Sequence, residues 1–198
     1  MTNIIFFGPP GAGKGTQAKI ISDNLKITHL STGDILRKKI LEKDDLAIKL
    51  KKIMSDGKLV SDDILNSIVS SRLKNEASRG FILDGYPRTL QQANFLNKFL
   101  EKSLYEINFI FNIEINFDIL KKRILKRSIE EKREDDNLAV LETRFNEYSN
   151  STAKVSQLYK QSNSNIFHEI DGSLQISEIT KKIIQIIKKP WKLAKTYN

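Results

Sequence analysis

The chain of 198 residues contains no cysteine and no long apolar run. Without cysteine it forms no disulfide bond and offers no thiolate to a metal ion, which agrees with a protein of the cytoplasm. A membrane-spanning helix needs ~20 consecutive apolar residues, and the first residues show neither the basic segment nor the cleavage site of a signal peptide. We therefore expect a globular cytoplasmic protein of one domain, without a membrane partner.

Acidic residues are in the minority, since 24 Asp and Glu stand against 33 Lys and Arg and leave a net charge of +9. Such a balance is typical of proteins that bind nucleic acid, membrane surfaces or anionic substrates. The lysines are scattered along helical stretches, and aromatic residues do not alternate with basic ones as they do on surfaces that stack bases. We interpret most of the charge as solvated surface. A nucleic-acid-binding protein is an alternative that rests on the charge alone.

Short apolar segments alternate with longer segments of helical periodicity. The segments that predict buried strands are 3–7, 28–30, 81–83, 109–115 and 166–170. The helical patterns run over 14–25, from 61 to near 80, over 116–127, over 137–159, and from 173 or 177 to 188. Strands that alternate with helices predict an α/β protein with a parallel sheet, here of five strands flanked by helices.

The first predicted strand leads directly into GPPGAGKGT, which occupies residues 8–16. Its glycines let successive backbone N–H groups turn toward an anion, and the dipole of the following helix favours negative charge there. Lys14 stands in the register of the lysine that reaches β- and γ-phosphates. A strand before the loop and a helix after it are the context that a phosphate loop requires, so we expect a P-loop fold.

The same loop lacks the hydroxyl that ligates Mg²⁺ in most P-loop enzymes. The expected Ser or Thr is Gly15, and the hydroxyl comes one residue later, at Thr16. A metal ion here would be held mainly by nucleotide oxygens and water, which Mg²⁺ tolerates because it dehydrates reluctantly. Such a loop suits an enzyme whose second substrate brings another phosphate to the metal.

Further motifs accompany the loop. They are HLSTGDILR (29–37), GKLVSDDI (57–64), GFILDGYPRTLQQA (80–93) and RILKRSIEEKREDDN (123–137). Together with GPPGAGKGTQ (8–17) they closely resemble adenylate kinase, in order, from residue 3 to about 188. The resemblance implies a monomer that transfers the terminal phosphoryl group of MgATP to AMP and gives two ADP, with no nucleic-acid partner.

The resemblance also implies a division of the chain. It gives a core (1–30, 61–125 and 137–198), an NMP-binding lobe over the nucleoside monophosphate (31–60) and a lid over ATP (126–136). Only five residues separate Arg127 from Arg133, so this would be a short lid. Long-lid relatives often bind zinc there, but the lack of cysteine and of room excludes zinc here.

In the AMP site, the resemblance assigns the adenine edge to Thr32 and Gln92, the α-phosphate to Arg37 and Arg88, and close backbone approach to Gly85. A planar guanidinium matches a phosphate bidentately. The full set that it implies is Thr32, Arg37, Lys58, Leu59, Val60, Gly85, Tyr86, Pro87, Arg88, Gln92, Arg133 and Arg144.

In the ATP site, the loop would wrap the phosphates, Arg123 would stack on the adenine, and a carbonyl between Gly172 and Leu174 would touch that base. The full set is Gly11, Ala12, Gly13, Lys14, Gly15, Thr16, Arg123, Arg127, Gly172 and Leu174. The implied catalytic residues are Lys14, Asp84, Arg88, Arg127, Arg133 and Arg144.

Asp84 follows a predicted strand as the acid of a Walker-B motif does, and we expect it to orient the water shell of Mg²⁺, with no direct protein ligand to the metal. Asp135 and Asp136 either orient arginines of the lid or cap the next helix, and both readings stay open. We interpret His29 and His168 as structural, since transfer to a phosphate oxygen needs no general base.

The nearest rival is a UMP/CMP kinase, which shares the fold and differs in the acceptor base. Relatives of that kind tend to carry Asn after the Pro-Arg pair and again three residues later. Thr89 and Gln92 stand at those positions and favour adenine.

Overall fold

The computed structural model describes residues 1–131 and 137–189, and in this part of the chain helices enclose a five-stranded sheet. The strands are β1 (Thr2–Phe7), β2 (Thr28–Ser31), β3 (Gly80–Asp84), β4 (Phe109–Glu114) and β5 (Phe167–Asp171). Their order is β2-β3-β1-β4-β5, and all four pairings are parallel. The predicted fold class is confirmed.

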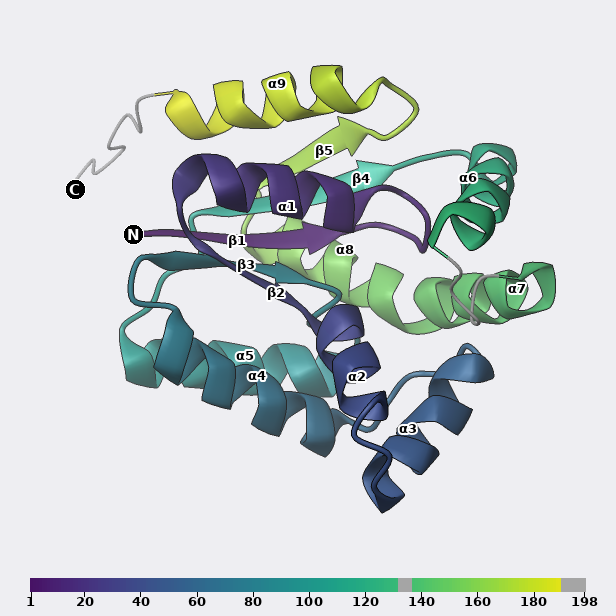
Figure 1. Cartoon of the computed structure of the whole chain (residues 1–198). Coiled ribbons are helices and arrows are strands. Elements are labelled where there is room, and N and C mark those ends of the chain that lie inside the picture. Colours follow the sequence, from purple (N-terminus) through teal and green to yellow (C-terminus); the bar gives the residue numbers. More distant parts are fainter. Residues whose placement is uncertain (132–136, 190–198) are drawn as a thin grey trace.

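The connections between these strands are mostly helical (Figure 1). The helices are α1 (Lys14–Leu25), α2 (Thr32–Ile40), α3 (Asp45–Ser55), α4 (Asp62–Glu76), α5 (Leu90–Ser103), α6 (Phe117–Glu131), α7 (Leu138–Glu147), α8 (Ala153–Ser162) and α9 (Ile176–Lys188). A π-helical turn, η1 (Tyr148–Thr152), joins α7 to α8 without a break. The segment 126–131, which the resemblance assigns to the lid, continues helix α6.

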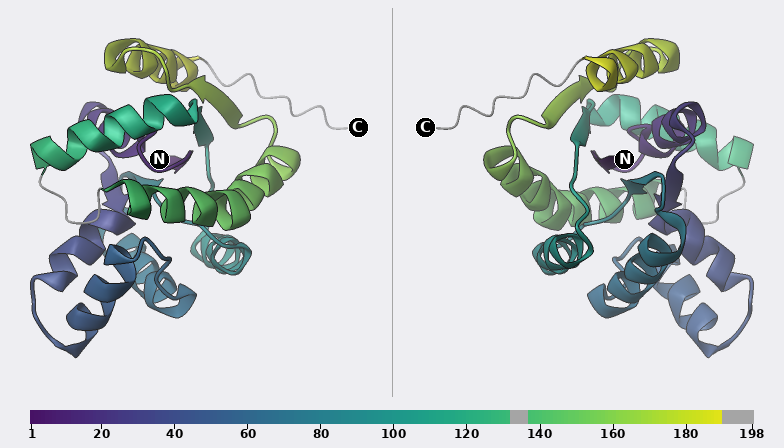
Figure 2. Two further views of the ribbon diagram at one scale, coloured as in Figure 1. Left: turned by 90° about the vertical axis from the view of Figure 1, so that its right-hand side faces the viewer. Right: turned by 90° about the vertical axis from the view of Figure 1, so that its left-hand side faces the viewer.

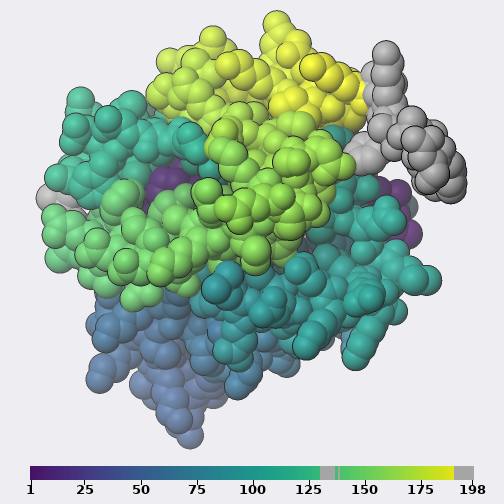
Figure 3. All heavy atoms as spheres, turned by 180° about the vertical axis from the view of Figure 1, so that it is seen from behind, coloured from purple at the N-terminus to yellow at the C-terminus, as the bar shows by residue number. Residues whose placement is uncertain are grey.

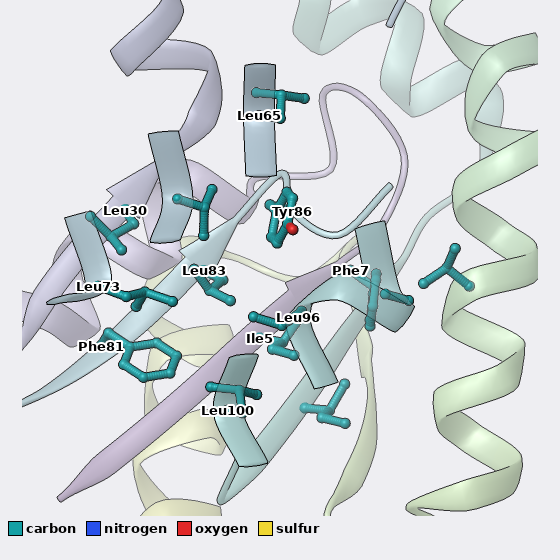
Figure 4. Packing of buried hydrophobic residues seen from close by; sticks show 14 of the residues in the cluster. Ile5, Phe7, Leu30, Leu65, Leu73, Phe81, Leu83, Tyr86, Leu96 and Leu100 are labelled. Atoms are coloured by element: carbon teal, nitrogen blue, oxygen red, sulfur yellow. The ribbon is translucent and has the colours of Figure 1, made fainter. Parts of the chain in front are cut away.

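The two faces of the sheet bury different apolar clusters, because side chains alternate along each strand. On one face, Ile5 and Phe7 of β1 and Phe81 and Leu83 of β3 point toward α4, α5 and α8 (Figure 4). On the other face, the cluster joins α1, α6 and α9. Its buried members are Ile4, Phe6, Ala12, Ala18, Ile21, Ile82, Phe111, Ile113, Leu120, Ile170, Ile179 and Ile183. The side views show helices on both sides of the strands (Figure 2).

Helices α2 and α3 extend away from the sheet, at the end where the strands stop (Figure 1). Each begins at a side-chain cap: Ser31 Oγ accepts from Asp34 N, and Asp44 Oδ1 accepts from Ala47 N. Such caps satisfy amide groups that have no partner within the helix. Few side chains of these helices are buried; Leu36 of α2 and Leu50 of α3 join the main apolar cluster, and the two helices also pack on one another.

Within residues 1–131 and 137–189, no helix combines the length and the apolar character needed to cross a membrane.

Candidate active site

The strand ends of β1, β2 and β3 open into one cleft of about 860 Å³. Ser31 and Asp84 lie side by side at the ends of β2 and β3, and Phe6 of β1 pairs with Asp84. In open parallel sheets, ligands bind at this carboxyl edge, where neighbouring connections leave the sheet on opposite faces.

The phosphate loop forms the floor of the cleft. Gly8, Gly11 and Gly13 have φ angles of 140°, 83° and 98°, which side-chain-bearing residues rarely adopt. Helix α1 starts at Lys14, so the amides of the loop and the positive end of the helix dipole face the same space. Lys14 Nζ donates to the carbonyls of Gly8 (2.8 Å) and Pro9 (2.9 Å), within its own loop.

Asp84 lies against the helix start at the end of β3. A Cβ built on Gly15 would stand only 3.3 Å from Asp84 Oδ2, so a side chain at this position would crowd the carboxylate. His29 Nε2 lies 3.4 Å from the same oxygen. Burial acts to raise the pKa of Asp84, but the contact with His29 and the charges of Lys14 and Arg88 outweigh it, so the pKa lies below its ordinary value.

Several cations converge on the space above Lys14. The pKa of Lys14 is lowered to about 8: burial is the largest cause, Asp84 opposes it, and the charges of Arg88, Arg127 and Arg144 add to the lowering. These arginines come from the loop after β3, from α6 and from α7. Mutual repulsion of this kind is relieved when an anion enters, so the cleft is built for a strongly negative ligand.

The loop after β3 is held tightly by its neighbours. Thr32 Oγ1 donates to the carbonyl of Gly85 (2.9 Å), and Arg88 Nε donates to the same oxygen (2.7 Å). A Cβ on Gly85 would meet Arg88 Nη2 at 2.6 Å and Thr32 Oγ1 at 2.8 Å, and its φ is 78°, so only glycine fits. Arg37 lies across the cleft and pairs with Asp34 on its own helix.

Unlike most residues expected at the AMP site, Gln92 does not line the cleft. Its side chain is fully buried, with Nε2 donating to Asp62 Oδ1 (2.7 Å) and Oε1 accepting from Arg88 N (2.7 Å). Each end of the amide still has one hydrogen-bonding position left, because an amide has two donor hydrogens and two acceptor lone pairs. The structure thus puts Gln92 behind the wall of the cleft, as a support of Arg88.

The segment after α3 reaches across to helix α7. A Cβ on Gly57 would stand 3.0 Å from the carbonyl oxygen of Val140 and 3.2 Å from Arg144 Cγ. The view from behind shows the α7–α8 segment directly above the α2–α3 segment (Figure 3). Gly57 therefore brings the backbone of residues 57–60 close to the helix that carries Arg144.

Most of the residues expected at the site line this one cleft. They are Gly11, Ala12, Gly13, Lys14, Gly15, Thr16, Thr32, Arg37, Lys58, Leu59, Val60, Asp84, Gly85, Tyr86, Pro87, Arg88, Arg123, Arg127, Arg144 and Leu174. Gln92 and Gly172 do not line it. Gly172 packs against Ile113 and donates its N–H to Glu114. Arg133, Asp135 and Asp136 lie outside the described residues.

Comparison with known proteins agrees with this geometry. The sequence model of adenylate kinase matches residues 6–164. The chain is 37% identical to an adenylate kinase of Thermosipho melanesiensis, with 94% of this chain and 100% of the relative covered. It is 39% identical to one of Leptospira biflexa (94% and 100% covered) and 40% identical to one of Xylella fastidiosa (91% and 96% covered).

The chain belongs to the adenylate kinase family.

In this member of the adenylate kinase family, the structure adds residues that sequence reasoning left aside. His29, interpreted as structural, lines the cleft beside Asp84, and Tyr148 and Thr152 of the π turn line it as well. For His29 a signal existed, because it lies two residues before the end of a strand that pairs with β3. The π turn has no comparable sequence pattern.

Proposed function

We propose that the chain is an ATP:AMP phosphotransferase, which moves the terminal phosphoryl group of MgATP to AMP and gives two ADP. One observation carries this proposal: the phosphate loop and the arginine-bearing loop after β3 face each other across one cleft, with Lys14, Arg88, Arg127 and Arg144 between them. Relatives of 37–40% identity that are named adenylate kinase support AMP over the UMP and CMP of the rival reading.

On the donor side, we assign the ATP phosphates to residues 11–16 and to Arg127. Arg123 Nη1 lies 3.4 Å from the carbonyl of Ala12, and Leu174 also lines the cleft. This position at the mouth of the loop suits a guanidinium that stacks on a base. We keep Arg133 in the proposed set as a residue of the lid.

On the acceptor side, we assign the AMP phosphate to Arg37 and Arg88 and the base and ribose to the backbone of residues 58–60, with Thr32, Gly85 and Gln92 at the adenine edge. Arg37 would exchange its ion pair with Asp34 for the phosphate. Residues 31–60 and 126–136 would act as the mobile NMP-binding lobe and lid, which exclude water when they close.

The donor set fits a hydrated Mg²⁺ that arrives with ATP. Within residues 1–131 and 137–189, no three His, Asp or Glu side chains come together as a metal site. Asp84 supplies the oxygen chemistry that Mg²⁺ prefers, and an aspartate at this place would hold the ion through its waters. When bound, the ion would neutralise charge on the phosphate oxygens.

The chemistry that this chain supplies is positioning and charge. Lys14 and the arginines would hold both phosphate chains in line and stabilise the charge that spreads over the transferring group. No side chain has to remove a proton, because the attacking oxygen already belongs to a phosphate. We further propose that the protein acts as a monomer in the cytoplasm on ATP, AMP and ADP.

A coupled assay tests the function directly. ADP formation is measured from MgATP with AMP, CMP, UMP or GMP as acceptor, and Lys14→Met serves as the inactive reference. We expect AMP to be preferred by orders of magnitude, since a mismatched base leaves buried polar groups unpaired. Turnover of UMP or CMP equal to that of AMP would identify the chain as the rival UMP/CMP kinase. Wild-type turnover no higher than that of Lys14→Met would contradict the kinase proposal.

A further inference from the structure

The π-helical turn η1 presents two consecutive hydroxyls to one backbone atom of the active site. Ser151 Oγ donates to the carbonyl oxygen of Arg88 at 2.9 Å, and Thr152 Oγ1 donates to the same oxygen at 3.2 Å. Thr152 is buried and lines the cleft. A carbonyl oxygen has two lone pairs, so the two hydroxyls saturate it.

These hydroxyls bond outside their own helical segment, as Thr32 of α2 also does, whereas several helical serines of the described residues bond within theirs. Ser and Thr within helices commonly donate to a carbonyl three or four residues earlier, as Ser128 does to Leu125 and Ser162 does to Leu158. Ser151 and Thr152 instead bond to a loop more than sixty positions away in sequence. Turns with i→i+5 bonding occur rarely and often at functional sites.

The backbone N–H and the side-chain Nε of Arg88 are also hydrogen-bonded. Its N–H donates to Gln92 Oε1 (2.7 Å) and its Nε donates to the carbonyl of Gly85 (2.7 Å). The backbone of Arg88 is thereby held by α5 at its N–H and by η1 at its carbonyl oxygen. Since α7, η1 and α8 run without a break, the same helical segment carries Arg144.

We propose that Ser151 and Thr152 are positioning residues, whose hydroxyls hold Arg88 at a fixed place relative to Arg144. The proposal rests on the proposed phosphotransferase, in which both arginines meet the phosphates. The charges of Arg88 and Arg144 both act on Lys14 although they come from different elements, and the hydrogen bonds of the π turn link these two elements.

The decisive variant is Ser151→Ala/Thr152→Val, which removes both hydroxyls and preserves shape. A displacement of about 1 Å in a catalytic group can cost about 100-fold in rate, and we expect kcat/KM for AMP to fall by that order, while KM for ATP changes by less than about 2-fold. Each single change leaves one bond and should cost about 5-fold. Ser149→Ala, on the exposed side of the same turn, is the matched control.

A double-mutant cycle separates positioning from general weakening of the fold. In an Arg88→Lys background, removal of both hydroxyls should cost far less than in the wild type, because the guanidinium that they place is gone. An equal loss in both backgrounds, or a double variant with the wild-type kcat/KM, overturns the proposal. If the double variant does not fold, wild-type rates in both single variants overturn it instead.

A second readout does not depend on the reaction. The Nε proton of Arg88, which is bonded to Gly85, should exchange slowly with solvent in the wild type and markedly faster in the double variant, as followed by NMR. Unchanged exchange contradicts the positioning role. Because this measurement needs no turnover, a failure of the proposed function and a failure of this inference give different results.

Discussion

Lys14 donates both of its described hydrogen bonds to carbonyls of its own loop, at a pKa lowered to about 8. Phosphate oxygens would replace these carbonyls and favour the charged amine. The depressed pKa also means that the charged form destabilises the fold below pH 8, and that this cost fades as pH rises toward the unfolded value near 10.5. Lys14→Met should therefore be no less stable than the wild type at pH 7.

ATP binding should depend on pH through this lysine. The amine is charged below about pH 8 in the free protein and would stay charged at higher pH in the complex, so affinity should be level near pH 7 and fall as pH rises through 8. Calorimetry at pH 8.5 in buffers of different ionisation enthalpy should show proton uptake. Lys14→Met should lose this uptake, whereas Lys19→Met, an exposed change on the same helix, should keep it. Equal wild-type affinity at pH 7 and pH 9 would contradict the assignment.

Gln92 gives a prediction about the acceptor. Gln92→Leu keeps the volume but removes one of the two donors to Asp62 Oδ1, where Thr89 Oγ1 remains, and leaves Arg88 N without its side-chain acceptor. It also removes the amide positions proposed for adenine. We expect KM for AMP to rise at least about 10-fold, with KM for ATP nearly unchanged. Gln91→Leu, the exposed neighbour, is the control. An unaltered KM for AMP would leave Gln92 with a structural role alone.

Asp84→Asn tests the water-shell account of the metal. The change keeps the size of the side chain and loses the charge that would attract a hydrated ion, so kcat should fall by orders of magnitude and more Mg²⁺ should be needed for half-maximal rate. AMP binding measured without metal should change little. The measurement is a Mg²⁺ titration of both proteins at fixed ATP. Micromolar Mg²⁺ binding by the nucleotide-free wild type would point instead to a direct protein ligand.

At the scale of elements, the contact between residue 57 and α7 should govern the acceptor site. Gly57 has a φ of 72°, and a Cβ would meet the Val140 carbonyl at 3.0 Å, so Gly57→Ala should push the 57–60 backbone away from α7. We expect a higher KM for AMP with little change for ATP, and a loss of stability of about 1–2 kcal/mol from the left-handed backbone. Ser55→Ala is the control, because the hydrogen bond described for its hydroxyl goes to Lys52 O within α3. Thermal unfolding and both KM values decide the matter.

Strands β1, β3 and β4 could be predicted closely because each is a short, mostly apolar run whose side chains are buried on both faces of the sheet. Predicted segment 109–115 is β4 (Phe109–Glu114), and predicted segment 3–7 is β1 (Thr2–Phe7). The Asn137 cap was also confirmed, since its Oδ1 accepts from Val140 N. Burial and capping are local properties, and local sequence reports them well.

Helices α2, α3 and α5 were not predicted, for a physical reason. Only Thr32 and Leu36 of α2 are buried, so its apolar stripe is too short to recognise. The buried face of α5 starts with Gln92, a polar residue. Likewise the segment 137–159 was predicted as one helix, and nothing in its pattern indicates the π turn within it, because that turn serves a tertiary contact with Arg88.

For the whole molecule, the charge of +9 and the cationic cleft should make nucleotide capture sensitive to salt. Screening shortens from about 10 Å at 0.1 M to about 3 Å at 1 M ionic strength. We expect kcat/KM for ATP to fall several-fold between about 0.05 M and 0.5 M NaCl at fixed free Mg²⁺. Sucrose at matched osmolality should have little effect. A value of kcat/KM that does not change with NaCl would mean that long-range electrostatic attraction does not speed the association of ATP with the protein.

The position of β1 at the centre of the sheet has a consequence for how the chain folds. β1 precedes both of its neighbours in sequence, yet Thr2 pairs with Gly80 and Ile4 with Phe109. Its pairing therefore closes long loops, and the chain loses the entropy of closing them before the new contacts stabilise the sheet. The strand that carries the phosphate loop cannot be completed locally. The nucleotide site would then form late in folding, after the sheet has assembled, and would not nucleate the sheet.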